Sequence, residues 1–244
     1  LKAPLKSSHL VSPLASPNMR IFRSEFGHDY PSYAFGYTES AELEDELPAI
    51  AYEAGYLPAS SDPSVHNRFY MARSIRVPLK DFAPTSENRR ILKKFDGQFT
   101  VDLIPREELS ESVGFKKCFL SYFADRHGQS VMTAERLSGI LNTTLPLRGV
   151  RYTKDDLTAA HVLEIEGEGF SHYWFSCYDM SYAGTSLGMW LMLDAVRRAK
   201  DAGYAYLYLG TAYGAKGRYK MNITPLEFWD GSEWNADETL LKKL

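Results

Sequence analysis

The stretch GTSLGMWLMLDAVRRAKDAGYAYLYLG, residues 184–210, carries a helix pattern followed at once by a strand pattern. From about Ser186 it is apolar on nearly all sides, which predicts a buried helix, and it ends in basic residues, as helix C-termini favour. Upstream lie HVLEIEG and FSHYWFSCYD, two strand patterns that we expect to form a hairpin turned at residues 167–169. The order strand, loop, helix, strand implies a right-handed crossover and a mixed sheet.

The start of this helix is a candidate binding point. Gly188 falls in the first turn, where a residue without a side chain lets a neighbouring backbone or a ligand come close. The free N–H groups of a helix N-terminus suit an acyl carbonyl or a phosphate. Simple packing of Gly188 against a strand explains the glycine equally well, and the helix alone does not decide between the two.

Further elements are expected in the first half of the chain. A short strand and loop should span residues 19–37, and FYMARSIRVPL, residues 69–79, alternates well enough for a strand. Helices are predicted over residues 41–54, 86–95, 107–127 and 133–141. The first of these should be capped by Thr38 or Ser40 and ended by Gly55. Residues 1–18 lack the apolar centre of a signal peptide, and we expect a flexible leader without chemistry.

Composition excludes several classes of protein. The chain has 244 residues with a formal charge of −3 and a pI near 6.1, which argues against a protein that coats nucleic acid non-specifically. No run of 18 apolar residues is present, so we expect no membrane span. Cys118 and Cys177 form no CxxC pair, so no zinc or iron–sulfur knuckle is predicted, and we expect no metal and two reduced thiols in a cytoplasmic protein.

The helix predicted over residues 86–95 carries a basic face. The net negative charge of the chain does not exclude such a local patch. Its four cations stand at i, i+4 spacings, which places like charges together, and a polyanion would relieve their repulsion. A solvated helix face is the ordinary alternative for such a run. The four residues are Arg89, Arg90, Lys93 and Lys94.

Several short motifs together resemble the arginyl- and leucyl-tRNA–protein transferases. In the second half YDMSYAGTSLG, the strand YLG and YKMNITPLE stand in the family's order and spacing. In the first half IRVPLKDFAPTSENRR and YFADRH are similar to family segments, so the resemblance runs from about Tyr33 to Trp234. The matching positions are Arg76, Val77, Pro78, Phe82, Pro84, Arg89, Arg90, Tyr122, Arg126, His127, Tyr178, Asp179, Ser186, Leu187, Gly188, Tyr208, Leu209, Gly210, Tyr219, Lys220, Pro225, Leu226 and Glu227.

The chain departs from the family pattern in three places. The family carries a cysteine cluster, associated with a metal or iron–sulfur site and with reading the acceptor, where this chain has FYMARS, residues 69–74. The family's arginine ahead of SLG is Thr185 here. The loop between YLG and YK is shorter and reads GAKGR. These differences indicate a remodelled member.

The resemblance implies an α/β (α+β) fold of the GNAT acyltransferase type, with a mixed twisted sheet and flanking helices. Two neighbouring parallel strands, FSHYWFSCYD and YAYLYLG, should splay apart to admit an acyl donor beside the following helix. It also implies an acceptor-reading N-terminal subdomain over residues 19–105 and a transferase domain over residues 106–244. The implied reaction moves an amino acid from charged tRNA to the amine of a protein N-terminus, a peptide or a small acceptor, without a cofactor.

Such a reaction turns an ester into an amide and needs an oriented neutral amine and support for a tetrahedral oxyanion. Asp179 is the first candidate to contact or deprotonate the amine, with Tyr178 beside it, and Glu227 is the second. Either carboxylate has a structural alternative, Asp179 in a turn and Glu227 as an ion-pair partner of Lys220 or Arg218. The expected donor-binding residues are Ser186, Leu187, Gly188, Tyr208, Gly210, Arg218, Tyr219 and Lys220.

The basic helix residues Arg89, Arg90, Lys93 and Lys94 are then expected on the tRNA backbone. Tyr208 and Tyr219 would hold a hydroxyl or stack on its terminal adenine, with a place in the core as the alternative for both. His172 is expected to be structural. Two other functions stay open. An acyl-CoA-dependent acyltransferase would need a basic, glycine-rich pyrophosphate loop, and AGTSLG lacks its basic lead. A non-catalytic binding protein on the same fold is favoured by the lost cysteines and by Thr185.

Overall fold

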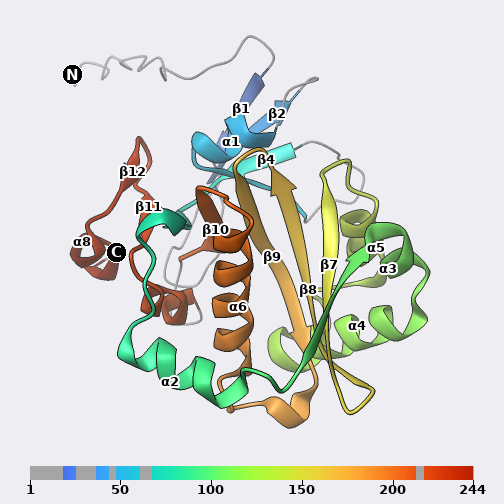
Figure 1. Cartoon of the computed structure of the whole chain (residues 1–244). Helices are drawn as coiled ribbons and strands as arrows, with labels where there is room; N and C mark the ends of the chain where they lie inside the picture. Colours follow the sequence, from blue (N-terminus) through green and yellow to red (C-terminus); the bar gives the residue numbers. More distant parts are fainter. Residues whose placement is uncertain (1–18, 26–36, 44–47, 61–67, 213–216, 244) are drawn as a thin grey trace, which may run out of the picture.

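The computed structural model describes residues 19–25, 37–43, 48–60, 68–212 and 217–243. Residues 1–18, for which the sequence predicts a leader, lie outside this set, as does Lys216 of the basic loop. Figure 1 shows a large sheet with helices on both faces and a smaller sheet at one end. Across the described residues, no helix combines the length and apolar character needed to cross a bilayer.

The main sheet has eight strands in the order β12-β11-β5-β10-β9-β8-β7-β6. Neighbouring strands are antiparallel except for β9 and β10, which are parallel, so the sheet is mixed as predicted. The strand bounds are β5 Ser74–Pro78, β6 Thr100–Pro105, β7 Leu147–Lys154, β8 Leu157–Gly167, β9 Phe170–Tyr178, β10 Tyr206–Thr211, β11 Glu227–Trp229 and β12 Trp234–Asn235.

The small sheet has the order β1-β2-β4-β3 and comes entirely from the N-terminal part of the chain. Its strands are β1 Met19–Glu25, β2 Tyr37–Leu43, β3 Tyr56–Pro58 and β4 Arg68–Met71, with the short helix α1, Pro48–Glu53, between β2 and β3. The strands β5 and β6 of the main sheet also precede residue 106. The main sheet therefore extends across the boundary that the sequence placed after residue 105.

Three element predictions need correction. Residues 41–54 hold the end of β2 and then α1, because β2 pairs with β1 and β4 and a proline such as Pro48 fits the first turn of a helix, not its interior. The predicted strand 69–79 is two strands in different sheets, β4 and β5. The predicted helix 107–127 is interrupted at Ser112, which follows α3, Arg106–Glu111, and caps the next helix by accepting a hydrogen bond from the Phe115 N–H.

The helices form two layers. Helices α2, Ser86–Phe95, and α6, Leu187–Asp201, cover one face of the main sheet. Helices α3, Arg106–Glu111, α4, Val113–His127, and α5, Ala134–Leu141, lie over the other face. Alternate residues of β7 point to the two layers, since Tyr152 packs on Trp190 of α6 and Gly149 lies against Leu109 of α3. The short helix α8, Glu238–Lys243, follows β12.

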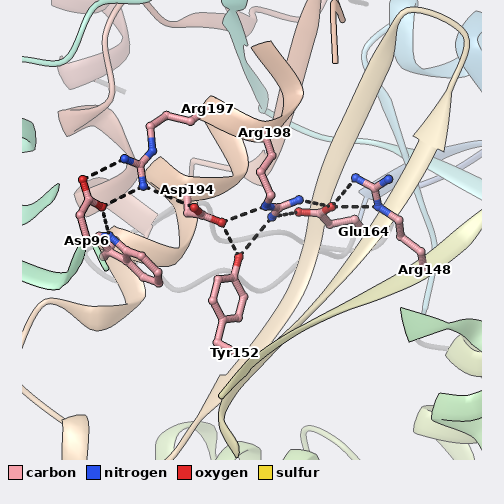
Figure 2. Close-up of polar contacts among 8 residues, drawn as sticks. Asp96, Arg148, Tyr152, Glu164, Asp194, Arg197 and Arg198 are labelled. Carbon is pink, nitrogen blue, oxygen red and sulfur yellow. Dashed lines mark hydrogen bonds and ion pairs between the residues drawn. The ribbon is translucent and has the colours of Figure 1, made fainter. Parts of the chain in front are cut away.

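A network of buried ion pairs anchors the C-terminal half of α6 on the sheet, as Figure 2 shows. Glu164 of β8 has a 1% exposed side chain and meets Arg198 of α6 at 2.7 Å and Arg148 of β7 at 3.0 Å. Arg198 also bonds Asp194 at 2.8 Å, and Asp194 accepts the Tyr152 hydroxyl at 2.8 Å. Every charge in this chain of contacts therefore has an opposite charge against it.

The same network continues outward to α2. Arg197 bonds Asp96, which follows α2, at 2.9 Å, and Trp190 donates its indole N–H to the same carboxylate at 3.0 Å. Hydrogen bonds from Arg197 and Trp190 oppose the effect of burial and leave the pKa of Asp96 below its usual value. The network thus fixes α2 against α6, and both against the sheet.

Candidate functional site

The pairing between β9 and β10 stops partway along both strands. It covers Tyr206–Phe170, Leu207–Ser171 and Tyr208–His172, and beyond that point β9 continues to Tyr178 and β10 to Thr211 without pairing each other. We call the opening between the diverging ends the wedge. Gly210 lies in it with φ +79°, a conformation that side chains disfavour, where the register against β5 also shifts. The splayed pair expected from the sequence is confirmed.

Lys220 places its ammonium group in the wedge. The residue belongs to the short 3-10 helix η3, Arg218–Asn222, and its Nζ donates to the carbonyl oxygens of Leu209 at 2.7 Å and Thr211 at 3.2 Å. A Cβ atom on Gly210 would stand 3.4 Å from this nitrogen. Within the described chain no carboxylate pairs with Lys220, and loss of hydration lowers its pKa to about 8.

His172 lies where the two strands part, and sequence reasoning had given it no functional role. Its ring is 1% exposed, and Nδ1 is 2.7 Å from the hydroxyl of Tyr52 in α1. Among the described residues nothing bonds its Nε2, which is fully buried. Burial first, and the nearby Lys220 second, lower the pKa of His172 to about 3, so the ring is neutral. No pattern in the sequence signals this environment, because Tyr52 and His172 are 120 positions apart.

Helix α6 begins at the open end of the wedge. Ser186, its N-cap residue, has φ +74° and makes no side-chain cap, so the N–H groups of the first turn are not satisfied by that side chain. Gly188 is half-buried, and a Cβ atom there would lie 3.4 Å from the ring of Tyr178. Leu187 is in the core. Both readings of Gly188 are therefore compatible with the geometry, since an aromatic ring and an exposed helix start meet at it.

Tyrosines gather at the mouth of the wedge. The rings of Tyr122 from α4 and Tyr178 from β9 have centroids 4.8 Å apart, and burial together with the neighbouring Tyr178 raises the pKa of Tyr122. Tyr219, next to Lys220, is 46% exposed and stays accessible to a ligand. The neutral hydroxyls of these side chains are both donors and acceptors.

A pocket of about 580 Å³ opens beside this cluster, between α4 and the ends of β8 and β9. Its charged lining consists of Lys117, Asp125, Arg151 and Asp179. Asp179 is exposed and accepts a hydrogen bond from the Ser181 N–H at 2.8 Å. Bonds from the Ser181 side chain and backbone hold the pKa of Asp179 below its usual value, so this carboxylate stays ionised.

The remaining predicted residues fall into the core or onto the surface. Glu227 pairs with Arg76 at 2.6 Å, so its partner is neither Lys220 nor Arg218, which lie on η3 outside the β5–β11 pairing. Tyr208 is 1% exposed, and its hydroxyl accepts a hydrogen bond from Nη1 of the same Arg76 at 3.4 Å. The Arg76 guanidinium also packs on the rings of Tyr206 and Trp234. The structure thus gives the half-buried Glu227 and the buried Tyr208 a shared structural setting around Arg76. Arg218 is exposed.

Helix α2 borders the wedge at both of its ends. Near its start, the buried Asn88 donates to the Asn222 carbonyl of η3 at 3.1 Å. Near its end, Lys94 donates to the Thr185 carbonyl ahead of α6 at 2.7 Å. The other three cations, Arg89, Arg90 and Lys93, are also exposed. Arg89 donates a hydrogen bond to the Pro84 carbonyl, and Arg90 forms an ion pair with Glu87. The four cations therefore lie on a helix that is tied to two walls of the wedge.

No group of three or more His, Cys, Asp or Glu side chains in the described residues is placed to hold a metal ion. The site consists of the wedge with Lys220, the helix start with Gly188, the tyrosines and the pocket. Such an arrangement offers an ammonium group at the diverging strands, the N–H groups of a helix start, and an ionised carboxylate at the adjoining pocket.

Comparison with known proteins gives this geometry a context. Residues 116–230 match the family described as "Arginine-tRNA-protein transferase, C terminus". Proteins named aspartate/glutamate leucyltransferase are similar: one from Parvibaculum lavamentivorans is 30% identical over 172 residues, covering 67% of this chain and 69% of its own length. One from Cereibacter sphaeroides is 29% identical over 176 residues, covering 67% of this chain and 61% of its own length. This chain thus spans about three fifths to two thirds of these relatives.

Solved structures give weaker likenesses. FemX aligns with a TM-score of 0.47 at 8% identity, covering 75% of this chain and 65% of that protein. The C-terminal domain of a putative lysylphosphatidylglycerol synthetase from Agrobacterium fabrum aligns with a TM-score of 0.44 at 15% identity, covering 61% and 49%.

Proposed function

Because this chain belongs to the family of the arginine-tRNA–protein transferases and aspartate/glutamate leucyltransferases, we propose that it transfers an amino acid from a charged tRNA to a primary amine. The observation that carries the proposal is the wedge, in which the Lys220 ammonium, with no carboxylate partner among the described residues, faces the diverging strands beside a helix start. Charged tRNA is a cytoplasmic donor, and we place the reaction there.

The donor would lie with its aminoacyl ester in the wedge. The first turn of α6 offers N–H groups to the last phosphate or the ester carbonyl, and Gly188 leaves the approach open. The exposed Tyr219 is placed to stack on the terminal adenine. The cations of α2 would meet the tRNA backbone further out, since the helix borders the same opening.

The acceptor would enter through the pocket under α4. Asp179 is too weak a base to take a proton efficiently, because its pKa is lowered, so we assign it to hold and orient the acceptor ammonium. The relatives are named for aspartate and glutamate, and Lys117 and Arg151 in the same pocket would suit an acidic first residue. Leucine as the amino acid transferred follows the same names and is part of the proposal.

Lys220 would act on the reacting carbonyl. The acceptor ammonium first gives one proton to water, and the neutral amine nitrogen then attacks the ester carbon, so that the carbonyl oxygen becomes an oxyanion. The C–O bond to the ribose breaks as Lys220 protonates the departing oxygen, and the second proton of the nitrogen returns Lys220 to its ammonium form. An ammonium in a poorly hydrated wedge stabilises that oxyanion, and a pKa of about 8 lets it pass a proton to the departing ribose oxygen. Positioning on two backbone carbonyls keeps the group in place before the substrate arrives.

A transfer assay tests the proposal. The protein is incubated with tRNAs charged with labelled amino acids and with peptides that differ in their first residue, and acetyl-CoA is run in parallel. We expect label to pass from leucyl-tRNA to peptides with an acidic first residue. Transfer from acetyl-CoA alone would replace the proposal with an ordinary acyltransferase, and tRNA binding without transfer would leave a binding protein.

A pair of variants assigns the carboxylate. Asp179→Asn should lower transfer about 10-fold or more, since it removes the charge that orients the amine. Asp230→Asn is the matched control, because Asp230 also accepts backbone N–H groups in an exposed turn but does not line the pocket. Equal rates for the two variants would remove Asp179 from the mechanism.

A further inference from the structure

The two cysteines of the chain, 59 positions apart in sequence, meet in the fold. The sulfur of Cys118 in α4 lies 3.7 Å from that of Cys177 near the end of β9. Both are free thiols. Their spacing in the sequence does not predict this contact, because nothing in it reveals that α4 crosses the end of this strand.

The two thiols have unequal access to solvent. Cys118 is half-buried and lines the pocket of about 580 Å³, whereas Cys177 is 0% exposed. A hydrogen bond from the Cys177 thiol lowers the pKa of Cys118, while burial raises that of Cys177. A small oxidant that enters the pocket therefore meets the sulfur that more readily becomes a thiolate.

We propose that Cys118 and Cys177 form a reversible thiol-oxidation site whose reactant is hydrogen peroxide. The Cys118 thiolate attacks one peroxide oxygen, the O–O bond breaks, and the second oxygen leaves as water after protonation, which gives a sulfenic acid. The Cys177 sulfur then attacks the Cys118 sulfur and expels the hydroxyl group, which takes the Cys177 proton and leaves as water. Two thiols and one peroxide become one disulfide and two waters.

The position of the pair connects this chemistry to the transferase site. Tyr122 follows Cys118 by one helical turn, and Tyr178 and Asp179 directly follow Cys177. The rings of Tyr122 and Tyr178 are in contact at 4.8 Å. Joining the sulfurs draws α4 toward β9 at this contact and narrows the pocket. This consequence, unlike the thiol chemistry, rests on the proposed function, and it predicts that the oxidised protein transfers poorly.

Mass spectrometry of the full chain tests the thiol site directly. The protein is treated with hydrogen peroxide, free thiols are blocked with N-ethylmaleimide, and the digest is searched for the peptide pair that contains both cysteines. We expect this linked pair in the wild type, its loss with dithiothreitol, and its absence in C118S and C177S. Overoxidation of Cys118 to sulfinic acid without any linked pair would overturn the proposal, as would linkage only between chains.

A transfer assay on the same samples tests the consequence. Oxidised wild type should lose about 10²-fold in rate, as a displacement of about 1 Å at reacting groups would give, and regain it with dithiothreitol. C118S serves as the control even if C177S folds poorly. The transfer rate of C118S should be the same before and after peroxide treatment, whatever its value relative to the wild type. An unchanged rate in fully linked wild type would overturn the coupling to the site. Absence of transfer in every sample would count against the proposed function, and the linked peptide would still decide the thiol site.

Discussion

Helix α6 is anchored by the ion-pair network at its C-terminal half and begins at the open end of the wedge, and the network and the wedge differ in how their charges are neutralised. At its C-terminal half, Glu164 lies between two arginines, and each neighbouring charge has an opposite charge in contact. In the wedge, the ammonium of Lys220 bonds only backbone carbonyls among the described residues, and within the same set Nε2 of His172 has no partner.

The difference separates a structural role from a chemical one. A buried charge whose partners are all present costs little stability, but removing one of those partners is strongly destabilising. The network therefore fixes α6 without offering a reactive group. A half-buried cation that has no counter-charge among the described residues is costly, and its retention at the splayed strands indicates a role other than stabilising the fold. Four measurements can break or sharpen this contrast.

The largest effect should come from the network. Glu164→Ala leaves Arg148 and Arg198 without their shared partner, and we expect the free energy of unfolding to fall by about 3–5 kcal/mol. Urea denaturation measures it. Glu87→Ala is the control, since it removes one partner of the exposed pair with Arg90 and should leave stability unchanged. A loss below about 1 kcal/mol for Glu164→Ala would mean that the network is not the anchor of α6.

Acid should affect the wedge next. The pKa of His172 is about 3 in the folded chain and near 6.5 when unfolded, so the unfolded chain binds the proton first and stability falls as pH drops through this window. Between pH 6.5 and 4.5 the loss from this ring alone should be roughly 2–3 kcal/mol. His161, with a pKa of about 4, adds a loss of the same sign.

Urea midpoints measured across this pH range check the assignment. His172→Gln can keep a hydrogen bond to Tyr52 but cannot be protonated. The slope of its unfolding free energy against pH should therefore be smaller than that of the wild type, by the amount that corresponds to about one bound proton. Identical slopes for wild type and variant would show that His172 does not carry the acid sensitivity.

Removing the wedge cation should affect the reaction and spare the fold. Lys220→Met takes away the group assigned to the oxyanion, and we expect transfer to fall about 10²-fold. Unfolding free energy should stay the same or rise, because an uncompensated charge has been removed. Single-turnover assays and urea melts on one preparation test both statements. A destabilised variant with normal transfer would give Lys220 the structural role and reverse the comparison.

The smallest effect belongs to the surface of α2. Lys93→Ala should reduce the salt dependence of tRNA binding by about 0.7–0.9 in the slope of log affinity against log salt, the amount expected for one phosphate contact. The control is Lys243→Ala, an exposed cation on α8. Equal slopes for both variants would place the tRNA backbone away from α2.

Local patterns in the sequence predicted the elements that meet at the site. The helix from Ser186, the hairpin turned at residues 167–169 and the strand at Tyr206–Thr211 are all observed, because each is a long periodic segment with clear end signals. The helix predicted over residues 41–54 is observed only in α1, and the single strand predicted over residues 69–79 was wrong. Sheet partners override the local pattern in both places, and the alternation of residues 69–79 runs unbroken across the change of sheet.

Long-range contacts account for what the sequence did not reveal. The resemblance placed Lys220 at the donor site, but its bonds to Leu209 and Thr211 follow only from the turn of η3. Arg76 as the partner of Glu227 requires β5 to lie beside β11, and the meeting of Cys118 with Cys177 requires α4 to cross β9. None of these pairs has a local signature.

The place of β5 in the main sheet has a consequence for how the chain is made. Val77 pairs with Leu207, 130 positions later, and Ile75 pairs with Phe228, so β5 leaves the ribosome long before either partner strand exists. At about 5–20 residues per second, the wait is on the order of ten seconds. During that time two side chains that are 0% exposed in the finished fold, Ile75 and Val77, stay uncovered, which makes the nascent first half a natural client for chaperones.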